Sequence, residues 1–370
     1  MRHLTIRRPR HVVAIALAFA LTIGLAACGS ADGDGGGSDT TASTAPLLPV
    51  DYPAQWERVD APADCMCADG SPWAYFIREA DPTKVVFYLE GGGACFNAVT
   101  CSPGTATFKQ VVGNDGGFAA KDGIFDLGNP ANPLAGYSIV FVPYCTGDIH
   151  AGDVTKDYGN GVTVQHKGFV NGRTALEAMA ERFPDAETLV VAGSSAGAFP
   201  TPVYAGLAAE LLPDATIRVV ADSGGAIPDA MSLVVSNWGT IDALPDWPQF
   251  AGISATDFTP ALAFLTAAER VPGISFARLD YAFDRVLSGY AALAGLQPGN
   301  LVDTMKAGEA RIEAGGTPVA AWISPGNGHT VLGTANLYTQ SMNGESFIEW
   351  LTAFLRGEPR PDQYCTDCAG

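Results

Sequence analysis

The sequence has little basic charge, few histidines and only one long apolar run. Its 370 residues include 21 Lys and Arg against 39 Asp and Glu, for a formal net charge of −18 at pH 7. A chain this acidic offers no basic face for phosphate, so nucleic acid is excluded as an expected partner. Charged residues make up only 16% of the chain and hydrophobic residues 47%, which excludes a disordered or coiled-coil protein.

The one long apolar run lies near the N-terminus and is typical of an export signal. His11–Ala27 is short for a spanning helix and follows a basic segment that contains Arg2, Arg7, Arg8 and Arg10. The run ends Leu25-Ala26-Ala27-Cys28-Gly29, which resembles a bacterial lipobox. This resemblance predicts a lipoprotein signal peptide over residues 1–27 and a diacylglycerol on the thiol of Cys28. The alternative is an ordinary signal peptide followed by an incidental cysteine.

The segment after Cys28 predicts a tether. Residues 29–48 are rich in Gly, Ser, Asp, Thr and Ala, a composition that cannot bury a core. We therefore expect residues 28–48 to be a lipid-anchored flexible tether, which holds a folded domain (residues 49–370) at the extracytoplasmic face of the cell membrane. The length would permit two domains, but one large α/β domain also fits.

The remaining seven cysteines agree with an exported protein, because disulfides form outside the cytoplasm. Cys95 and Cys101 are close enough in sequence for a local disulfide, and Cys365 and Cys368 could form a terminal one. Seven is odd, so at least one thiol is free or pairs between chains. The alternative is a zinc site made by the pairs Cys65/Cys67 and Cys365/Cys368.

Apolar strand-like runs alternate with helical segments along the domain, which predicts a mostly parallel sheet with helices on both faces. In such sheets the chemistry lies on loops at the carboxyl ends of the strands. The predicted strands are residues 84–90, 137–143, 187–192, 217–221, 274–279 and 319–323, and the predicted helices are 172–183, 196–212 and 346–356.

The strongest local motif is Gly193-Ser194-Ser195-Ala196-Gly197, which has the G-x-S-x-G form. A strand is predicted before it and a helix after it, as a nucleophile elbow requires. Ser195 is then the candidate nucleophile, and small flanking residues are needed because the turn is sharp. The alternative is an ordinary tight Gly/Ser turn.

A serine nucleophile needs a base, and only His329 among the histidines lies downstream of Ser195, in a loop after a predicted strand. Three Asp residues near predicted strand ends could orient it: Asp222, Asp280 and Asp284. If the strand continues, Asp280 and Asp284 share one face, and Asp280 is then inside the strand, where an unpaired carboxylate is costly to bury. Asp284 would lie at the strand's carboxyl end, and Asp222 could bond its own backbone turn.

An oxyanion hole is predicted from two backbone segments. One N–H should come from Ala196, directly after the nucleophile, and another from the run Gly91-Gly92-Gly93-Ala94, which comes after a predicted strand. The glycines would allow close approach to a substrate oxygen. The alternative, a phosphate loop, lacks the Gly-Lys-Ser/Thr that it requires.

Six motifs in this order resemble the pectinacetylesterase/Notum family: LEGGGACF (89–96), PYCTGD (143–148), GSSAG (193–197), ADSG (221–224), AFD (282–284) and GNGH (326–329). The resemblance implies a single-domain α/β-hydrolase fold and hydrolysis of carboxylic esters without a metal or other cofactor. It also implies Ser195, Asp284 and His329 as the triad. Asp222 becomes a structural residue, and Gly92, Gly93 and Ala196 are the oxyanion donors.

The chain departs from the family near the expected acyl pocket. Ala198 stands where animal and plant members often have a second Gly, and Gly93-Ala94 where animal members have an aromatic residue. The acyl and alcohol parts of the substrate are therefore left open. Residues 231–273, which are rich in aromatics, could form a lid or could pack as ordinary helices.

Two alternative classes remain for the function, a non-catalytic protein and a serine hydrolase that acts on another bond. The fold could serve a non-catalytic surface-binding lipoprotein. The same triad could also serve a thioesterase, a peptidase or a polyester depolymerase, because it supports acyl transfer in general.

Overall fold

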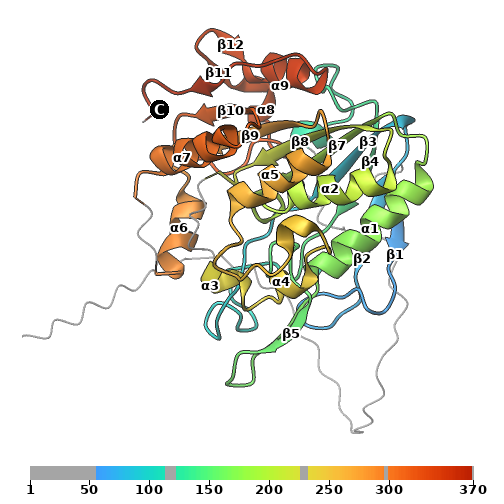
Figure 1. The fold of residues 1–370 in the computed structure, drawn as a ribbon, viewed down its shortest axis with the longest axis vertical. Coiled ribbons are helices and arrows are strands. Elements are labelled where there is room, and N and C mark those ends of the chain that lie inside the picture. The colour runs from blue at the N-terminus through green and yellow to red at the C-terminus, as the bar shows by residue number, and fades with distance from the viewer. Residues whose placement is uncertain (1–55, 113–121, 226–231, 296–298, 369–370) are drawn as a thin grey trace, which may run out of the picture. The chain divides into compact units, whose positions relative to one another are not determined.

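The computed structural model describes residues 56–112, 122–225, 232–295 and 299–368. The predicted signal peptide, the tether and Cys28 lie outside these residues. In the described part, one nine-stranded sheet has the order β1-β2-β4-β3-β7-β8-β9-β10-β13 (Figure 1). Neighbouring strands from β4 to β13 in this order are parallel, whereas β1 pairs antiparallel with β2 and β2 with β4.

The strands of this sheet are short and mostly buried. Their bounds are β1 Glu57–Asp60, β2 Ala74–Arg78, β3 Asp81–Leu89, β4 Tyr137–Val142, β7 Thr188–Ser194, β8 Thr216–Asp222, β9 Ser275–Tyr281, β10 Val319–Ser324 and β13 Gln363–Tyr364. Two separate hairpins pair β5 (Val154–Asp157) with β6 (Thr163–His166), and β11 (Ser341–Met342) with β12 (Glu345–Ser346).

The helices are distributed between the strands along the chain. Their bounds are α1 Gly168–Arg182, α2 Thr201–Leu211, α3 Ser232–Val235, α4 Thr240–Ala243, α5 Pro260–Arg270, α6 Arg285–Leu293, α7 Leu301–Ala314, α8 Asn336–Thr339 and α9 Phe347–Leu355, with short 3-10 helices η1 Gly123–Phe125, η2 Ser195–Gly197 and η4 Pro248–Phe250. Within the described residues, no helix combines the length and the apolar character needed to cross a bilayer.

Alternate residues of the central strands face two separate cores, because successive side chains of a strand point to opposite faces. Phe87 and Leu89 of β3 pack in the core that α1, α2, α5 and α7 cover, and the first three of these helices lie together over the sheet in Figure 1. Tyr88 lies in the opposite core, which α8, α9 and η1 cover. The predicted mostly parallel sheet with helices on both faces is confirmed.

The largest error in the predicted elements lies directly after the nucleophile. A continuous helix over 196–212 is wrong, because Ser195–Gly197 is the 3-10 helix η2 and α2 begins at Thr201. Pro200 and Pro202 explain this start: proline lacks an N–H and fits only the first turn of a helix. Strand β9 also runs to Tyr281, two residues beyond the predicted end.

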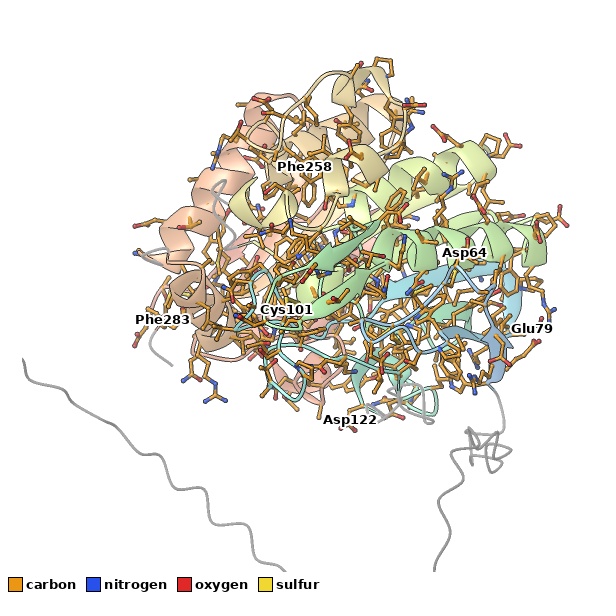
Figure 2. All side chains as sticks on the ribbon, turned by 90° about the horizontal axis from the view of Figure 1, so that it is seen from below. Asp64, Glu79, Cys101, Asp122, Phe258 and Phe283 are labelled. Atoms are coloured by element: carbon orange, nitrogen blue, oxygen red, sulfur yellow. A yellow bond between two sulfur atoms is a disulfide. The ribbon has the colours of Figure 1, made fainter. Side chains whose placement is uncertain are left out.

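The described residues of the aromatic segment 231–273 pack as ordinary helices. Trp238 and Trp247 are buried, and the indole N–H of Trp238 donates to the carbonyl of Cys95 at 2.8 Å. Phe258 lies among the helices in Figure 2 and contacts Phe250 edge to face. The packing alternative therefore describes this segment, as far as the structure describes it.

Candidate active site

Ser195 is the first residue of η2 and comes directly after the last residue of β7. Its φ of 54° is in the left-handed region, which non-glycine residues seldom adopt and which is common where function requires strain. A Cβ on Gly193 would come within 2.1 Å of the Gly197 carbonyl oxygen, and one on Gly197 within 2.1 Å of the Leu89 carbonyl oxygen. Both positions therefore require glycine, as a tight nucleophile elbow predicts.

Three side chains from three loops form a continuous hydrogen-bonded chain. Nε2 of His329 lies 2.8 Å from Oγ of Ser195, and Nδ1 of His329 lies 2.7 Å from Oδ2 of Asp284. Each residue comes after the carboxyl end of its own parallel strand, β7, β9 or β10. The structure thus brings together the three residues that the sequence predicted, in an order that can move a proton from the hydroxyl to the imidazole.

Asp284 is fully buried and is held by a helix. It is the N-cap of α6, and its Oδ1 accepts from the amides of Val286 and Leu287 at 2.9 and 3.0 Å. This leaves Oδ2 to face His329. The strand does not continue as far as Asp284, because β9 ends at Tyr281, so the argument that Asp280 and Asp284 share one face of a strand does not apply.

Asp280 lies inside β9 and is buried, and the imidazole Nδ1 faces Asp284 instead. Its Oδ1 accepts from the amide of Gly225 at 2.8 Å, and its Oδ2 has no hydrogen-bond partner among the described residues. Burial raises the pKa of Asp280 to about 7, although the positive charge of Arg278 opposes this effect. Asp280 therefore belongs to the core beneath the site.

Asp222 binds the segment that comes after His329. Its carboxylate accepts from the amides of Val331 and Leu332 at 3.0 and 2.9 Å and from Oγ of Ser194 at 2.7 Å. The prediction that it bonds its own turn is wrong in detail, because its partners are distant in sequence. Burial raises the pKa of Asp222 to about 6. Its contacts give it a structural role.

Two further hydroxyl groups extend this network. Tyr88 donates to Oγ of Ser194 at 2.8 Å, and Oγ of Ser223 accepts from the amide of Thr330 at 2.8 Å. Burial raises the pKa of Tyr88, which keeps the phenol a donor. Successive amides after His329 are thus bound at the carboxyl end of β8. No local motif in the sequence indicates Tyr88, because its partners are distant residues on other strands.

The glycine run lies directly against the nucleophile. A Cβ on Gly91 would come within 2.6 Å of the Ser194 carbonyl oxygen, and one on Gly92 within 2.4 Å of the Tyr144 ring. In the described part of the chain, no protein acceptor bonds the amides of Gly92, Gly93 or Ala196. These three amides are therefore available to a ligand oxygen, as an oxyanion hole requires.

A cavity of about 520 Å³ opens beside these groups. Ser195, His329 and the glycine run contribute to its lining, together with five aromatic residues: Tyr88, Phe108, Phe125, Phe141 and Tyr290. None of the described residues between 232 and 273 lines it. Its size and mostly apolar wall are typical of a site for a small organic group.

The cysteines form disulfides. Cys95 pairs with Cys101 and Cys365 with Cys368, as predicted, and Cys67 pairs with Cys145. The zinc alternative is therefore wrong, and the odd thiol is the buried Cys65.

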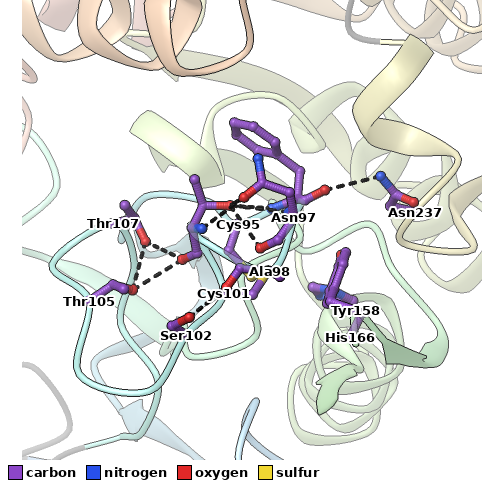
Figure 3. The surroundings of a disulfide bond; sticks show 12 residues. Cys95, Asn97, Ala98, Cys101, Ser102, Thr105, Thr107, Tyr158, His166 and Asn237 are labelled. Carbon is purple, nitrogen blue, oxygen red and sulfur yellow. Dashed lines mark hydrogen bonds between the residues drawn. A yellow bond between two sulfur atoms is a disulfide. The ribbon is translucent and has the colours of Figure 1, made fainter. Parts of the chain in front are cut away.

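His166 also lies close to the Cys95–Cys101 sulfurs (Figure 3), but these sulfurs are bonded to each other. The histidine nitrogens face the carbonyl of Thr146 and the hydroxyl of Tyr158, each at 2.8 Å. This group consequently has no ligand set to offer a metal.

Comparison with known proteins gives one family and several relatives. Residues 54–233 match the family model described as Pectinacetylesterase. The chain is similar to palmitoleoyl-protein carboxylesterase NOTUM of Mus musculus (29% identical over 173 residues, 43% of this chain and 33% of the relative) and of Homo sapiens (28% over 167 residues, 43% and 34%). It is also similar to the inactive palmitoleoyl-protein carboxylesterase notum1b of Danio rerio (29% over 109 residues, 28% and 76%).

The matched regions cover only part of the proteins. This chain spans about a third of the length of the mouse and human relatives. The family match includes the glycine run and Ser195 and ends before Asp284 and His329. The arrangement of the last two residues therefore rests on their hydrogen-bond geometry.

Proposed function

This chain belongs to the pectinacetylesterase/Notum family, and on that premise we propose that it hydrolyses carboxylic esters with Ser195 as nucleophile, His329 as base and Asp284 as orienting acid. The observation that carries the proposal is the hydrogen-bonded chain from Ser195 through His329 to Asp284, at 2.8 and 2.7 Å. It lies beside a glycine run with open amides.

The reaction proceeds in two acyl transfers. His329 Nε2 takes the hydroxyl proton while Ser195 Oγ attacks the ester carbonyl carbon, and the carbonyl electron pair moves onto oxygen. The amides of Ala196 and of Gly92 or Gly93 hold that oxyanion. Its collapse expels the alcohol, which takes the proton from His329. Water then repeats the attack on the acyl-enzyme, and the acid leaves.

Asp284 acts on the tautomer of His329. Its buried carboxylate accepts the Nδ1 proton, so that Nε2 remains free to accept from Ser195. The same contact stabilises the imidazolium that forms during the attack. The capping bonds from Val286 and Leu287 hold this carboxylate in place.

The acyl group is the open part of this proposal. The names of the matched family and of the mammalian relatives suggest two branches, an acetyl ester and a long unsaturated acyl ester on a protein. p-Nitrophenyl esters from acetate to palmitate distinguish these branches by the chain length at which kcat/KM is highest. Parallel assays with a thioester and with a peptide substrate test whether the protein cleaves these other bonds.

The catalytic assignment is tested with two adjacent serines. Ser195→Ala should lower kcat by about 10⁴- to 10⁶-fold, because it removes the nucleophile. Ser194→Ala is the matched control and should keep activity within about tenfold, with a lower melting temperature because Asp222 loses a donor. Near-normal turnover in Ser195→Ala would contradict the assignment.

We also propose that the protein is a lipid-anchored lipoprotein on the extracytoplasmic face of the cell membrane. The lipobox-like sequence before Cys28 supports this location. The three disulfides agree with an oxidising compartment.

A further inference from the structure

His150 is a buried histidine that the catalytic chain does not use. It is 1% exposed, and its Nε2 lies 2.8 Å from the carbonyl oxygen of Glu90, the residue before the glycine run. Burial lowers the pKa of His150 to about 4, so the imidazole is neutral near pH 7. Because a carbonyl can only accept, the Nε2 of this neutral ring carries the proton and donates it.

The backbone at Ile149 and His150 has an unusual conformation, and hydrogen bonds hold it in place. Ile149 and His150 both have positive φ, 53° and 56°, which is unusual for two successive non-glycine residues. Tyrosine hydroxyls hold the strained pair: Tyr144 accepts from the amide of Ile149 at 2.8 Å, and Tyr204 donates to the carbonyl of His150 at 2.9 Å. Such strain persists only where its surroundings enforce it.

The hydrogen bond to Glu90 matters because the next three residues are all glycine. Three successive glycines have more backbone freedom than any other tripeptide, so their amides are not oriented by the chain itself. In a trans peptide the C=O and the next N–H point in opposite directions. Fixing the Glu90 carbonyl therefore fixes the direction of the Gly91 amide and the entry of the chain into the run.

A second contact fixes the other end of the run. The amide of Lys109 donates to the carbonyl of Gly92 at 2.9 Å, and this orients the Gly93 amide by the same rule. The side chain of Glu90 is held as well, since its Oε2 accepts from the amide of Tyr144 at 2.9 Å and its Oε1 pairs with Lys109. His150 donates to the carbonyl that borders the run on its N-terminal side.

We propose that His150 is a positioning residue for the oxyanion hole: its Nε2–H holds the Glu90 carbonyl, which fixes how the chain enters the glycine run and so orders the amide of Gly92 before a substrate arrives. This inference rests on the proposed esterase function. It goes beyond it by assigning part of the transition-state stabilisation to a residue that touches neither substrate nor triad. Preorganised donors are worth more than mobile ones because no reorganisation is needed during the reaction.

The test compares His150→Leu, which removes the donor, with His150→Gln, whose side-chain amide can reach the same carbonyl. With a p-nitrophenyl ester, His150→Leu should lower kcat about 10- to 100-fold and leave KM within about threefold. n-Butylboronic acid, which forms a tetrahedral adduct on a reactive serine, should bind more weakly by the same factor as kcat falls. His150→Gln should recover most of both.

His166→Leu is the matched control. His166 is also fully buried, and burial likewise lowers its pKa to about 4, but its partners are Thr146 and Tyr158. Its removal should lower the melting temperature about as much as His150→Leu, with kcat and boronic acid affinity within about threefold of wild type.

The inference is overturned if His150→Leu keeps wild-type kcat and boronic acid affinity, or if its loss appears only in KM or in the melting temperature. It is equally overturned if His166→Leu lowers kcat as much, because the effect would then come from general packing of residues 143–152. Failure of the wild-type protein to hydrolyse esters and to bind the boronic acid would instead contradict the proposed function.

Discussion

Replacing Asp284 by Asn exchanges one carboxylate oxygen for an NH₂ group, and it should lower the activity while leaving the stability of the fold almost unchanged. In the wild-type protein, Oδ1 of Asp284 caps α6 at Val286 and Leu287, and Oδ2 accepts from His329. Asn keeps one oxygen for the two amides, and Asn caps helices as well as Asp does. The free energy of unfolding should therefore change by less than about 1 kcal/mol, which is a shift in melting temperature of about 3 °C or less.

The chemical effect of the same change should be large. With its oxygen on the amides of α6, the Asn NH₂ faces Nδ1 of His329, and two donors cannot face each other. The imidazole then places its proton on Nε2, where it cannot accept from Ser195. This loss of the correct tautomer should lower kcat about 10³- to 10⁴-fold with KM within a few-fold, because ground-state binding does not use the tautomer.

The assay is steady-state hydrolysis of one activated ester with a thermal melt of each protein. Asp284→Ala is a useful companion variant, because it also removes the cap of α6. Its free energy of unfolding should fall by about 1 kcal/mol, and its melting temperature should be lower. Asp284 is not the orienting acid if Asp284→Asn keeps kcat within tenfold of wild type while Asp222→Asn, with a normal melting temperature, loses far more activity.

Three further outcomes are expected. Asp222→Asn should lower the free energy of unfolding by about 2 kcal/mol, seen in urea melts, because it places an amide against the buried donors that bind this carboxylate. Asp280 has a raised pKa of about 7, so its contribution to stability is present below the unfolded pKa of 3.8 and is lost as pH rises towards 7. Asp280→Asn resembles the protonated form, so the melting temperature of the variant minus that of wild type should increase from about pH 4 to pH 7. A difference that does not change with pH would contradict this. Cys28→Ser should move the protein from the membrane fraction to the soluble exported fraction on fractionated blots, and unchanged membrane association would contradict the lipid anchor.

Much of the sheet was predictable because the signals are local. The buried runs that became β3, β4, β7 and β8 are continuous and apolar, and the elbow motif lies between a strand and a helix. Ser195 and His329 were predictable from motif and position, whereas spacing left Asp222, Asp280 and Asp284 open and only the family resemblance indicated Asp284. Helix starts were less predictable, because the prolines before and within α2 delay it while the elbow forms a 3-10 turn instead.

The supporting contacts could not be predicted, because they join residues that are far apart in sequence. Asp222 bonds the amide of Val331, 109 positions away, and Tyr88 meets Ser194 across two neighbouring strands. Strand periodicity gives the face of each side chain but not its partner on another strand. His150 carried no motif of its own, and only the fold brings its ring to the Glu90 carbonyl.

Covalent labelling by a fluorophosphonate is the sharpest test of whether Ser195 is an activated nucleophile. Only a serine that a base has activated attacks the phosphorus and displaces fluoride, so the label reports the chemistry of the site whatever the natural substrate is. We predict one label per chain, located on Ser195 by peptide mass spectrometry, abolished in Ser195→Ala and in His329→Ala and retained in Ser194→Ala. An unlabelled wild-type protein, or a label that persists in Ser195→Ala, would mean that Ser195 is not the activated nucleophile.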